Sequence, residues 1–516
     1  MLTEEQLACV NTTEPRVGVM AGAGTGKTSV IVARIRKLLD SGVSPRSIVV
    51  FTFTRKAAQE LIDRLGEDAN GMRVGTFHSI SLDYDRSLEC DSQLQVLGER
   101  ASRVMLDTAV SMAGVKGTTA HWHKIISSRG MYPNIESHQK VIDYYGSLLR
   151  INGATDYQGL LIRLLVLAAI DTGSEIRYVL VDEAQDTDPL QWKIVDAFVS
   201  HGAELFCVGD IKQSIYGWRG ANYKDFLDRC PVIYDITESF RNPPDVLDAA
   251  NAIILESGME SPLLRSSKTQ CGLSLTADPV SITVKSLIKD ELFSPSDIAV
   301  LCRTNRTVQL VQEELQSDGI KCTDLAGDRA KLEILQPLIS LIAYPNGINR
   351  KILQQEWSPP HDAGLPNFLE RLSDITDAEM AVLANMWRDG LCVKPTVRAV
   401  LGEINHVLNE ESVELWNNKY GDWDLRDALQ DLATSSITPS NSSGVTVCTV
   451  HQSKGLEFPA TVVVCEPISR IDEEDYRVFY VALTRARERC IVTDSCRVAT
   501  QFMQIVRREH LKWKMK

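Results

Sequence analysis

Residues 21–28 read Ala21-Gly22-Ala23-Gly24-Thr25-Gly26-Lys27-Thr28, between a short apolar run at 16–20 and a segment of helical periodicity at 29–39. In such a strand–turn–helix setting, backbone N–H groups cradle phosphates, the lysine reaches the β and γ oxygens, and the threonine hydroxyl ligates Mg²⁺. The strict motif has glycine where Ala21 stands. We interpret the stretch as a phosphate-binding loop rather than a simple glycine-rich turn, with ATP and Mg²⁺ as cofactors.

Further strands and helices alternate around this loop, which favours a parallel sheet with its functional residues at the strand carboxyl ends. The strands expected in this first core lie at 16–20, 47–53, 178–181 and 205–208, and a helix is expected at 56–65. A second α/β pattern begins near residue 281, breaks near 345 and resumes later. Its expected strands are 297–302, 445–450 and 461–465, with a helix at 307–316. The fold class is therefore α/β with two parallel-sheet cores, each interrupted by a mainly helical insertion.

The boundaries follow from these changes of pattern. Residues 1–82 and 173–268 are assigned to the first core, 83–172 to its helical insertion, 269–349 and 436–516 to the second core, and 350–435 to a second, reduced insertion.

Composition excludes several classes of protein. The 516 residues carry a net charge of −13, and the 12 cysteines show no C-x-x-C pair, so zinc ribbons and iron–sulfur clusters are not supported. No segment reaches the roughly 18 apolar residues of a membrane span, and the acidic first residues are unlike a signal peptide. We expect a cytoplasmic protein without membrane contact. The acidic net charge argues only weakly against a nucleic-acid partner, since local grooves bind phosphates.

Two adjacent carboxylates, Asp182 and Glu183, end the apolar run 179–181. Beside a phosphate-binding loop, Asp182 suits the Mg²⁺ site, and Glu183 suits orientation and deprotonation of the attacking water. Acidic residues at a strand end are more often simply exposed to solvent. A phosphate-binding loop on the same predicted sheet makes the catalytic interpretation the favoured one.

Residues 209–221 are the most specific stretch, Gly209-Asp210-Ile211-Lys212-Gln213-Ser214-Ile215-Tyr216-Gly217-Trp218-Arg219-Gly220-Ala221. Gln213 follows a strand end, so its amide could sense a γ-phosphate. Tyr216, Trp218 and Arg219 offer two aromatic faces and a guanidinium, which is typical of a platform on which bases stack. The alternative, a set of core aromatics, fits poorly with the flanking glycines.

Together with these stretches, six others resemble the superfamily-1 DNA helicases of the UvrD/Rep/PcrA type, in order along the chain. They are Thr52-Phe53-Thr54-Arg55-Lys56-Ala57-Ala58, Gly75-Thr76-Phe77-His78-Ser79, Glu238-Ser239-Phe240-Arg241-Asn242-Pro243, Cys302-Arg303-Thr304-Asn305, Thr449-Val450-His451-Gln452-Ser453-Lys454-Gly455-Leu456-Glu457-Phe458-Pro459 and Val478-Phe479-Tyr480-Val481-Ala482-Leu483-Thr484-Arg485-Ala486-Arg487. The resemblance implies two RecA-like cores. Arg55 stands where the family usually has asparagine, and Phe240 where it has tyrosine.

The resemblance also implies nucleotide contacts on both cores. Gln6 would read the adenine edge, Phe240 would stack on the base, and Arg241 would contact the γ-phosphate. In the second core, Glu457 would hold the sugar, Lys454 would couple DNA to phosphate, and Arg485 would be the arginine finger. Arg485 is expected to follow a strand-like run, and residues 472–475 to form a solvated loop.

By the same resemblance, DNA contacts fall at Phe53, Phe77, His78, Arg303, Asn305 and His451, in addition to Tyr216, Trp218 and Arg219. The alternative for Phe53, Phe77 and His78 is a core position at a strand end. The alternative for Arg303 and Asn305 is a surface loop. His121-Trp122-His123 lacks a third ligand at suitable spacing, so we expect it to serve packing or surface.

These observations predict an ATP-dependent helicase that moves along single-stranded DNA and separates duplex at junctions, with a monomeric motor unit and no identified accessory protein. The family implies 3′→5′ travel. Alternatives are a single-stranded-DNA-stimulated ATPase with little unwinding, a P-loop kinase or small-molecule ATPase, and a non-catalytic DNA scaffold. The kinase leaves Tyr216 and Trp218 unused, and a scaffold would not require Glu183 and Arg485.

Overall fold

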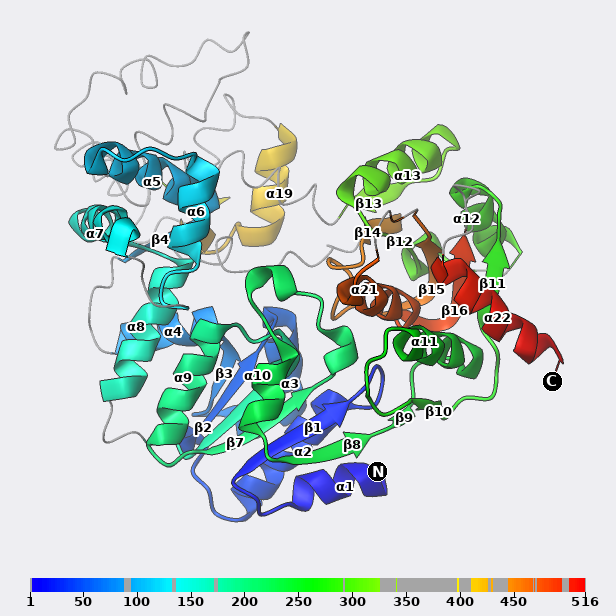
Figure 1. Ribbon diagram of the computed structural model, residues 1–516, viewed down its shortest axis with the longest axis horizontal. Coiled ribbons are helices and arrows are strands. Elements are labelled where there is room, and N and C mark those ends of the chain that lie inside the picture. The colour runs from blue at the N-terminus through cyan, green and yellow to red at the C-terminus, as the bar shows by residue number, and fades with distance from the viewer. Residues whose placement is uncertain are drawn as a thin grey trace, which may run out of the picture. The chain divides into compact units, whose positions relative to one another are not determined.

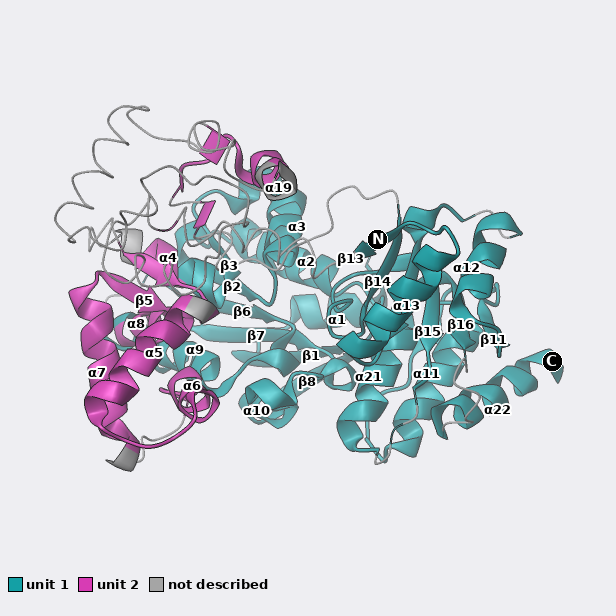
Figure 2. Ribbon diagram, turned by 90° about the horizontal axis from the view of Figure 1, so that it is seen from above, with its two compact units in different colours: residues 1–80, 167–325, 438–516 teal, residues 81–166, 326–437 magenta. Residues whose placement is uncertain are grey.

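The computed structural model describes residues 2–87, 94–131, 136–170, 175–290, 293–324, 340, 397–398, 410–425, 428–429, 444–466, 468, 471–493 and 501–515. The chain divides into two compact units (Figure 2). One comprises residues 1–80, 167–325 and 438–516, and the other comprises residues 81–166 and 326–437. Both predicted cores lie in the first unit, whereas the four-part division proposed from the sequence stays a prediction.

The first sheet has six strands in the order β3-β2-β6-β7-β1-β8, all parallel. Their bounds are β1 Arg16–Ala21, β2 Ile48–Thr52, β3 Arg73–Thr76, β6 Tyr178–Asp182, β7 Glu204–Gly209 and β8 Val232–Ile236. Every residue of β2 is buried, as is β1 after its first residue. Helices therefore cover both faces, as parallel sheets require. Because β1 lies between β7 and β8, the loop after β1 opens next to two other strand ends.

The helices of this sheet are α1 Glu4–Asn11, α2 Lys27–Asp40, α3 Arg55–Leu65, α9 Pro189–Ser200 and α10 Tyr223–Arg229. Among them, all but α2 begin at a residue whose side chain caps the helix. Thr3 caps α1 in a capping box with Gln6, and Asp188 does the same for α9 with Gln191. Ile31 and Ile35 of α2 pack into the same core cluster as Val17 and Val19 of β1.

The second sheet repeats the architecture, with six parallel strands in the order β11-β16-β15-β12-β14-β13 (Figure 1). Its strands are β11 Leu273–Thr276, β12 Ile298–Cys302, β13 Cys322–Asp324, β14 Val445–Thr449, β15 Phe458–Val464 and β16 Ala486–Thr493. Its helices are α11 Pro244–Glu256, α12 Val280–Lys289, α13 Asn305–Ser317, α21 Glu473–Leu483 and α22 Gln501–Met515. Two parallel sheets flanked by helices confirm the predicted fold class.

Two details expected of the second core differ in the structure. β11 lies within the predicted bounds that start at residue 269, but it precedes residue 281, near which the α/β pattern was expected to begin and which lies in α12; β11 is short and only its first residue is buried, so the sequence carries little strand signal. The run before Arg485 is helical, and residues 473–475 are its first turn rather than a solvated loop. Asp472 caps this helix in a capping box with Asp475. The whole of 477–483 is buried, so no amphipathic period marks it as a helix.

The second unit is mainly helical where it is described. It contains most of α4 Phe77–Ser87, then β4 Gln95–Leu97, α5 Glu99–Ala113, α6 Thr119–Ser127, α7 Glu136–Ile151, β5 Ala154–Asp156, most of α8 Tyr157–Ile170, and α19 Glu410–Tyr420. Trp122 is buried there with its ring against those of His121 and His138, in agreement with a packing role. The described residues of this unit form no group of metal-binding side chains. Most of the predicted insertion 350–435 lies outside the described residues, so its reduced size stays a prediction.

Among the described helices, none is both long and apolar enough to cross a membrane.

Candidate active site

The loop after β1 has the backbone that phosphate binding requires. Gly24 and Gly26 have φ angles of 73° and 84°, which favour glycine. At Gly22, a Cβ atom would lie 2.4 Å from Cδ2 of Leu264, so a side chain there would displace Leu264. Ala21, by contrast, is the last residue of β1 and pairs with Ile236. The residue that departs from the strict motif therefore lies in the strand, where a side chain is tolerated.

Lys27 and Thr28 open α2 directly after this loop. The Lys27 ammonium donates to the carbonyls of Ala21 and Gly22, at 3.4 and 3.5 Å, and lies 3.8 Å from Oε1 of Glu183. It therefore bends back over the loop, toward the place where phosphate oxygens would lie. The partial positive charge of the helix N-terminus adds to its attraction for anions.

Gln6 and Phe240 are both tied to the loop. Gln6 is 4% exposed, and its Nε2 donates to the Thr25 carbonyl at 2.8 Å. The Phe240 backbone N–H donates to the Gly24 carbonyl at 2.9 Å, while its side chain stays 47% exposed. Phe240 thus offers an open ring beside the loop. The amide of Gln6 is engaged with the loop itself, and its contact with adenine stays a prediction.

The two carboxylates at the end of β6 have opposite electrostatic environments. Burial, reinforced by neighbouring Glu183, raises the pKa of Asp182 to about 7. Burial also acts to raise the pKa of Glu183, but Lys27 and Lys454 outweigh it and lower that pKa to about 2. Glu183 therefore stays ionised and able to accept a proton, while Asp182 is sensitive to any cation that arrives.

The backbone at Glu183 is strained. Its φ angle is 52°, and no other non-glycine residue in the described part of the chain has a positive φ. The side chain accepts a hydrogen bond of 2.7 Å from Nε2 of Gln185. Strain of this kind persists only where surrounding contacts enforce it.

The Thr28 hydroxyl and the Asp182 carboxylate are hard oxygen donors of the kind that Mg²⁺ prefers. Asp182 lies at the strand end and Thr28 on the first turn of α2, beside the loop. The chemistry of this pair fits a magnesium ion.

Gln213 connects the two cores through its side chain. Its Nε2 donates to Oδ2 of Asp210 at 2.8 Å, and its Oε1 accepts from Nη2 of Arg485 at 2.9 Å. Arg485 is 2% exposed and also donates to the carbonyls of Val481 and Leu456. Burial and neighbouring Arg241 lower the pKa of Arg485 to about 10, so it stays charged at neutral pH.

Lys454 makes a second connection between the cores. Its ammonium donates to Oδ2 of Asp186 and to the Gln213 carbonyl, and both side chains of the ion pair are almost fully buried. Burial, reinforced by Glu183, raises the pKa of Asp186 to about 6 although Lys454 lies beside it. A third link is the ion pair of 2.6 Å between Nε of Arg241 and Oε2 of Glu457.

The aromatic platform is partly open. Trp218 is 71% exposed, and Arg219 lies 5.8 Å from the centre of its ring. Tyr216 stacks on Phe53 with centroids 4.9 Å apart, and its hydroxyl donates to the His451 carbonyl at 3.2 Å. Four of the predicted DNA-contacting residues therefore gather with His451 of the second core.

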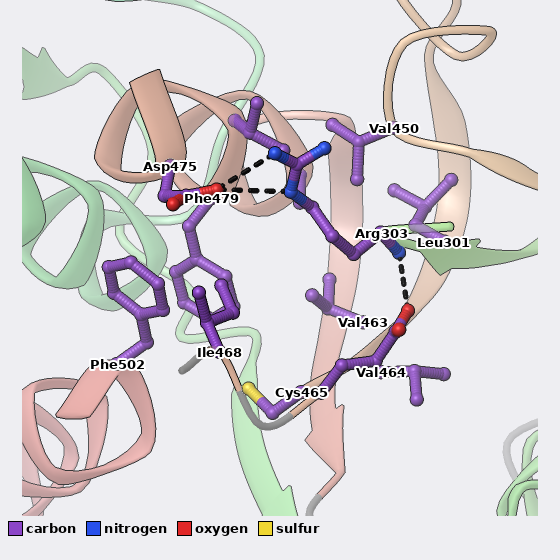
Figure 3. Close-up of a pocket in the computed structure, with 13 residues that line it drawn as sticks. Leu301, Arg303, Val450, Val463, Val464, Cys465, Ile468, Asp475, Phe479 and Phe502 are labelled. Atoms are coloured by element: carbon purple, nitrogen blue, oxygen red, sulfur yellow. Dashed lines mark hydrogen bonds and ion pairs between the residues drawn. The ribbon is translucent and has the colours of Figure 1, made fainter. Parts of the chain in front are cut away.

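The other predicted DNA contacts are less uniform. Phe77 is 5% exposed and stacks on Phe51 at 4.1 Å, so its ring belongs to the core, as the alternative reading held. His78 is half-buried, and Asn305 is exposed at the start of α13. Arg303 is engaged with Asp475 through two hydrogen bonds, of 2.8 and 3.1 Å, in Figure 3. The DNA roles of these residues stay predictions.

Sequence reasoning missed Asp186, Gln185 and Asp210. Gln185 is fully buried and joins Glu183, Asp186 and the Asp210 backbone by hydrogen bonds. They could have been found from their position in the sequence, because they directly follow the strands β6 and β7, next to residues already predicted for the site. Nothing in the sequence marked Lys454 as the partner of Asp186.

Two parallel-sheet cores joined through Gln213 and Arg485, with a glycine-rich loop of this geometry on the first, are typical of two-core P-loop nucleotide hydrolases. Comparison with known proteins specifies the family. Residues 2–230 match the UvrD/REP helicase N-terminal domain, and residues 444–493 match the UvrD-like helicase C-terminal domain.

Relatives cover nearly the whole chain. The chain is 26% identical to the ATP-dependent DNA helicase PcrA of Staphylococcus epidermidis, over 96% of this chain and 83% of the relative. The PcrA helicase of Leuconostoc citreum is 25% identical, with coverage of 96% and 82%. That of Staphylococcus aureus is 23% identical, with coverage of 95% and 83%. The chain belongs to the UvrD/Rep/PcrA-type DNA helicases of superfamily 1, which are ATP-hydrolysing enzymes.

Proposed function

We propose that this helicase couples ATP hydrolysis to 3′→5′ movement along single-stranded DNA and separates duplex where the strand meets a junction. The observation that carries the proposal is the hydrogen-bonded chain from Asp210 through Gln213 to Arg485. It joins the two cores only three residues before Tyr216, where the aromatic platform begins. Nucleotide and strand can therefore influence each other through one short segment.

The residues divide the work of hydrolysis. The loop and Lys27 would hold the phosphates, and Glu183 would take a proton from the attacking water. Mg²⁺, held by Thr28 and Asp182, would offset charge on the phosphate oxygens. Arg485 would turn from Gln213 to the γ-phosphate, where an arginine finger stabilises the transition state. Loss of the γ-phosphate removes that bridge and lets the cores part.

Strand movement follows if both cores grip DNA. Tyr216 and Trp218 on the first core, with Arg219, supply stacking that does not depend on base identity. Arg303, Asn305 and His451 would supply the grip of the second core. Because opening costs about 1.4 kcal/mol per base-pair step, the motor must hold each step it gains. The direction of travel is expected from the family.

Partial duplexes with a 3′ or a 5′ single-stranded tail test the proposal, with and without ATP and Mg²⁺. We expect ATP-dependent strand separation on the 3′-tailed substrate and little on the 5′-tailed one. Unwinding of the 5′-tailed substrate alone would contradict the direction. DNA-stimulated hydrolysis without separation of either would favour a translocase with little unwinding activity, and hydrolysis indifferent to DNA would contradict the motor itself.

A further inference from the structure

The first turns of α21 contact Arg303 of the second core and Ser214 of the first, which lie beside predicted DNA-contacting residues. Asp475 binds the guanidinium of Arg303 on its own core (Figure 3). Glu466 accepts from the Arg303 backbone N–H at 2.8 Å. Two residues after Asp475, Nε of Arg477 donates to the Ser214 carbonyl of the first core at 2.6 Å. Ser214 lies between Gln213 and the aromatic platform.

Arg477 is inserted into the first core rather than resting on its surface. It is 8% exposed, and its guanidinium lies 5.8 Å from the ring centre of Tyr223 on α10. Its Nη1 makes no hydrogen bond; the nearest carboxylate oxygen, on Glu473 of its own helix, is 3.8 Å away. A buried charge is destabilising unless it is hydrogen-bonded, so breaking the hydrogen bond from Arg477 to the Ser214 carbonyl would cost free energy.

A second contact also packs the start of α21 against the first core. Gly217 has no side chain, and a Cβ atom there would lie 2.8 Å from Oε2 of Glu474. The glycine thus leaves room for the start of α21 beside Trp218. The far end of α21 leads directly into Thr484 and Arg485. An 11-residue helix is about 16 Å long, so it spans from the platform to the phosphate site.

We propose that Arg477 is a positioning residue that transmits strand binding from the platform to Arg485. Bases that stack on Tyr216 and Trp218 move the Ser214 carbonyl, and Arg477 carries that displacement into α21. The helix then resets Arg485 against Gln213 and the γ-phosphate. This inference rests on the proposed function, because it explains how DNA would stimulate hydrolysis.

The test compares full-length Arg477→Ala and Arg477→Lys with wild type and with Arg508→Ala. Arg508 is an exposed arginine of α22 that pairs with Glu256. The measurements are ATP turnover with and without oligothymidylate, the KM for ATP, oligothymidylate affinity and the thermal midpoint. For Arg477→Ala we expect the DNA-stimulated kcat to fall about 10- to 100-fold, with basal turnover, KM and strand affinity within about threefold of wild type.

Arg477→Lys keeps a charge and a donor but loses the planar guanidinium over Tyr223, so we expect intermediate stimulation. This variant decides the question if Arg477→Ala does not fold. Wild-type stimulation in folded Arg477→Lys and Arg477→Ala would overturn the inference, as would an equal loss of basal and stimulated turnover. Absence of stimulation in wild type would instead overturn the proposed function. Arg508→Ala should behave as wild type.

Discussion

Both sheets have six parallel strands, but different residues follow the strands at their carboxyl edges. After β1, the first core has a glycine-rich loop with two left-handed glycines. After β12, the second core has Arg303 and then Thr304, whose side chain caps α13. Beside Arg303 the second core has a small, partly open and mainly apolar pocket, whose lining includes Leu301, Val463 and Phe479. The loop after β1 has the backbone conformation of a phosphate-binding loop, whereas the segment after β12 has no glycine and passes directly into α13.

The charges differ in the same way. The first core contributes the carboxylates Asp182, Glu183, Asp186 and Asp210 together with Lys27 of the loop, and the second contributes the cations Lys454 and Arg485. In the proposed mechanism, Glu183 of the first core acts together with Arg485 of the second. A site divided in this way makes hydrolysis depend on how the cores meet, which is what a motor requires.

The largest effect on ATP turnover is expected from replacing Arg485, which the second core contributes to the site. Arg485→Ala should lower ATP turnover by about 10³- to 10⁵-fold, because an arginine finger contributes that much to phosphoryl transfer. Steady-state hydrolysis at saturating ATP measures the effect. Arg508, an exposed arginine of α22 that pairs with Glu256, provides the matched control. Equal losses for Arg485→Ala and Arg508→Ala would contradict the assignment.

Glu183→Gln tests the acidic half of the site. The amide keeps the shape but cannot accept a proton, so we expect turnover to fall by about 10²- to 10⁴-fold. Binding of ATP and of DNA should persist, as measured by fluorescence anisotropy. Glu313→Gln changes an exposed glutamate on α13 and should leave turnover intact. Normal hydrolysis in Glu183→Gln would show that another group activates the water.

Trp218→Ala tests whether the first core grips DNA by stacking. Loss of one stacked base costs about 1–3 kcal/mol, so oligothymidylate affinity should weaken by roughly 5- to 150-fold. The KM for ATP should change little. Leu310→Ala removes a large side chain that is 56% exposed on α13 and serves as the control. A larger change in nucleotide binding than in strand binding would count against the platform.

The smallest expected effect concerns pH and the buried pair of Asp186 and Lys454. The pKa of Asp186 is raised from 3.8 to about 6, chiefly by burial. Between these values the folded protein keeps a proton that the unfolded chain has released, so this group makes stability fall as pH rises. Asp186→Asn removes that contribution. Urea unfolding without nucleotide at pH 4, 5 and 6 should therefore show the stability of wild type, relative to the variant, declining with pH; parallel curves would contradict the raised pKa.

The sequence predicted those parts of the molecule that depend on local pattern. The phosphate loop, the acidic strand end at Asp182 and the strands of the first sheet follow from short runs whose chemistry is visible in one dimension. Pairings between distant residues did not follow. Lys454 and Asp186 are 268 residues apart, and only the fold brings them together.

The helix α21 shows a second kind of failure. Its buried residues 477–483 are apolar on every side apart from Arg477, so the segment lacks the helical period and was expected to be strand-like. Asp475 was expected in solvent because charged residues cluster there, but its side chain completes the capping box of Asp472 and binds Arg303. Burial of a charge by a distant partner cannot be inferred from neighbouring residues alone.

The central claim is that nucleotide and single-stranded DNA are linked through the junction of the two cores. Linkage requires that each ligand change the affinity of the other. The direct measurement is the affinity of wild-type protein for oligothymidylate with ADP and with a non-hydrolysable ATP analogue, both with Mg²⁺. We predict affinities that differ by about fivefold or more, as expected for a coupling free energy of at least about 1 kcal/mol. Equal affinity in the two nucleotide states would contradict the account.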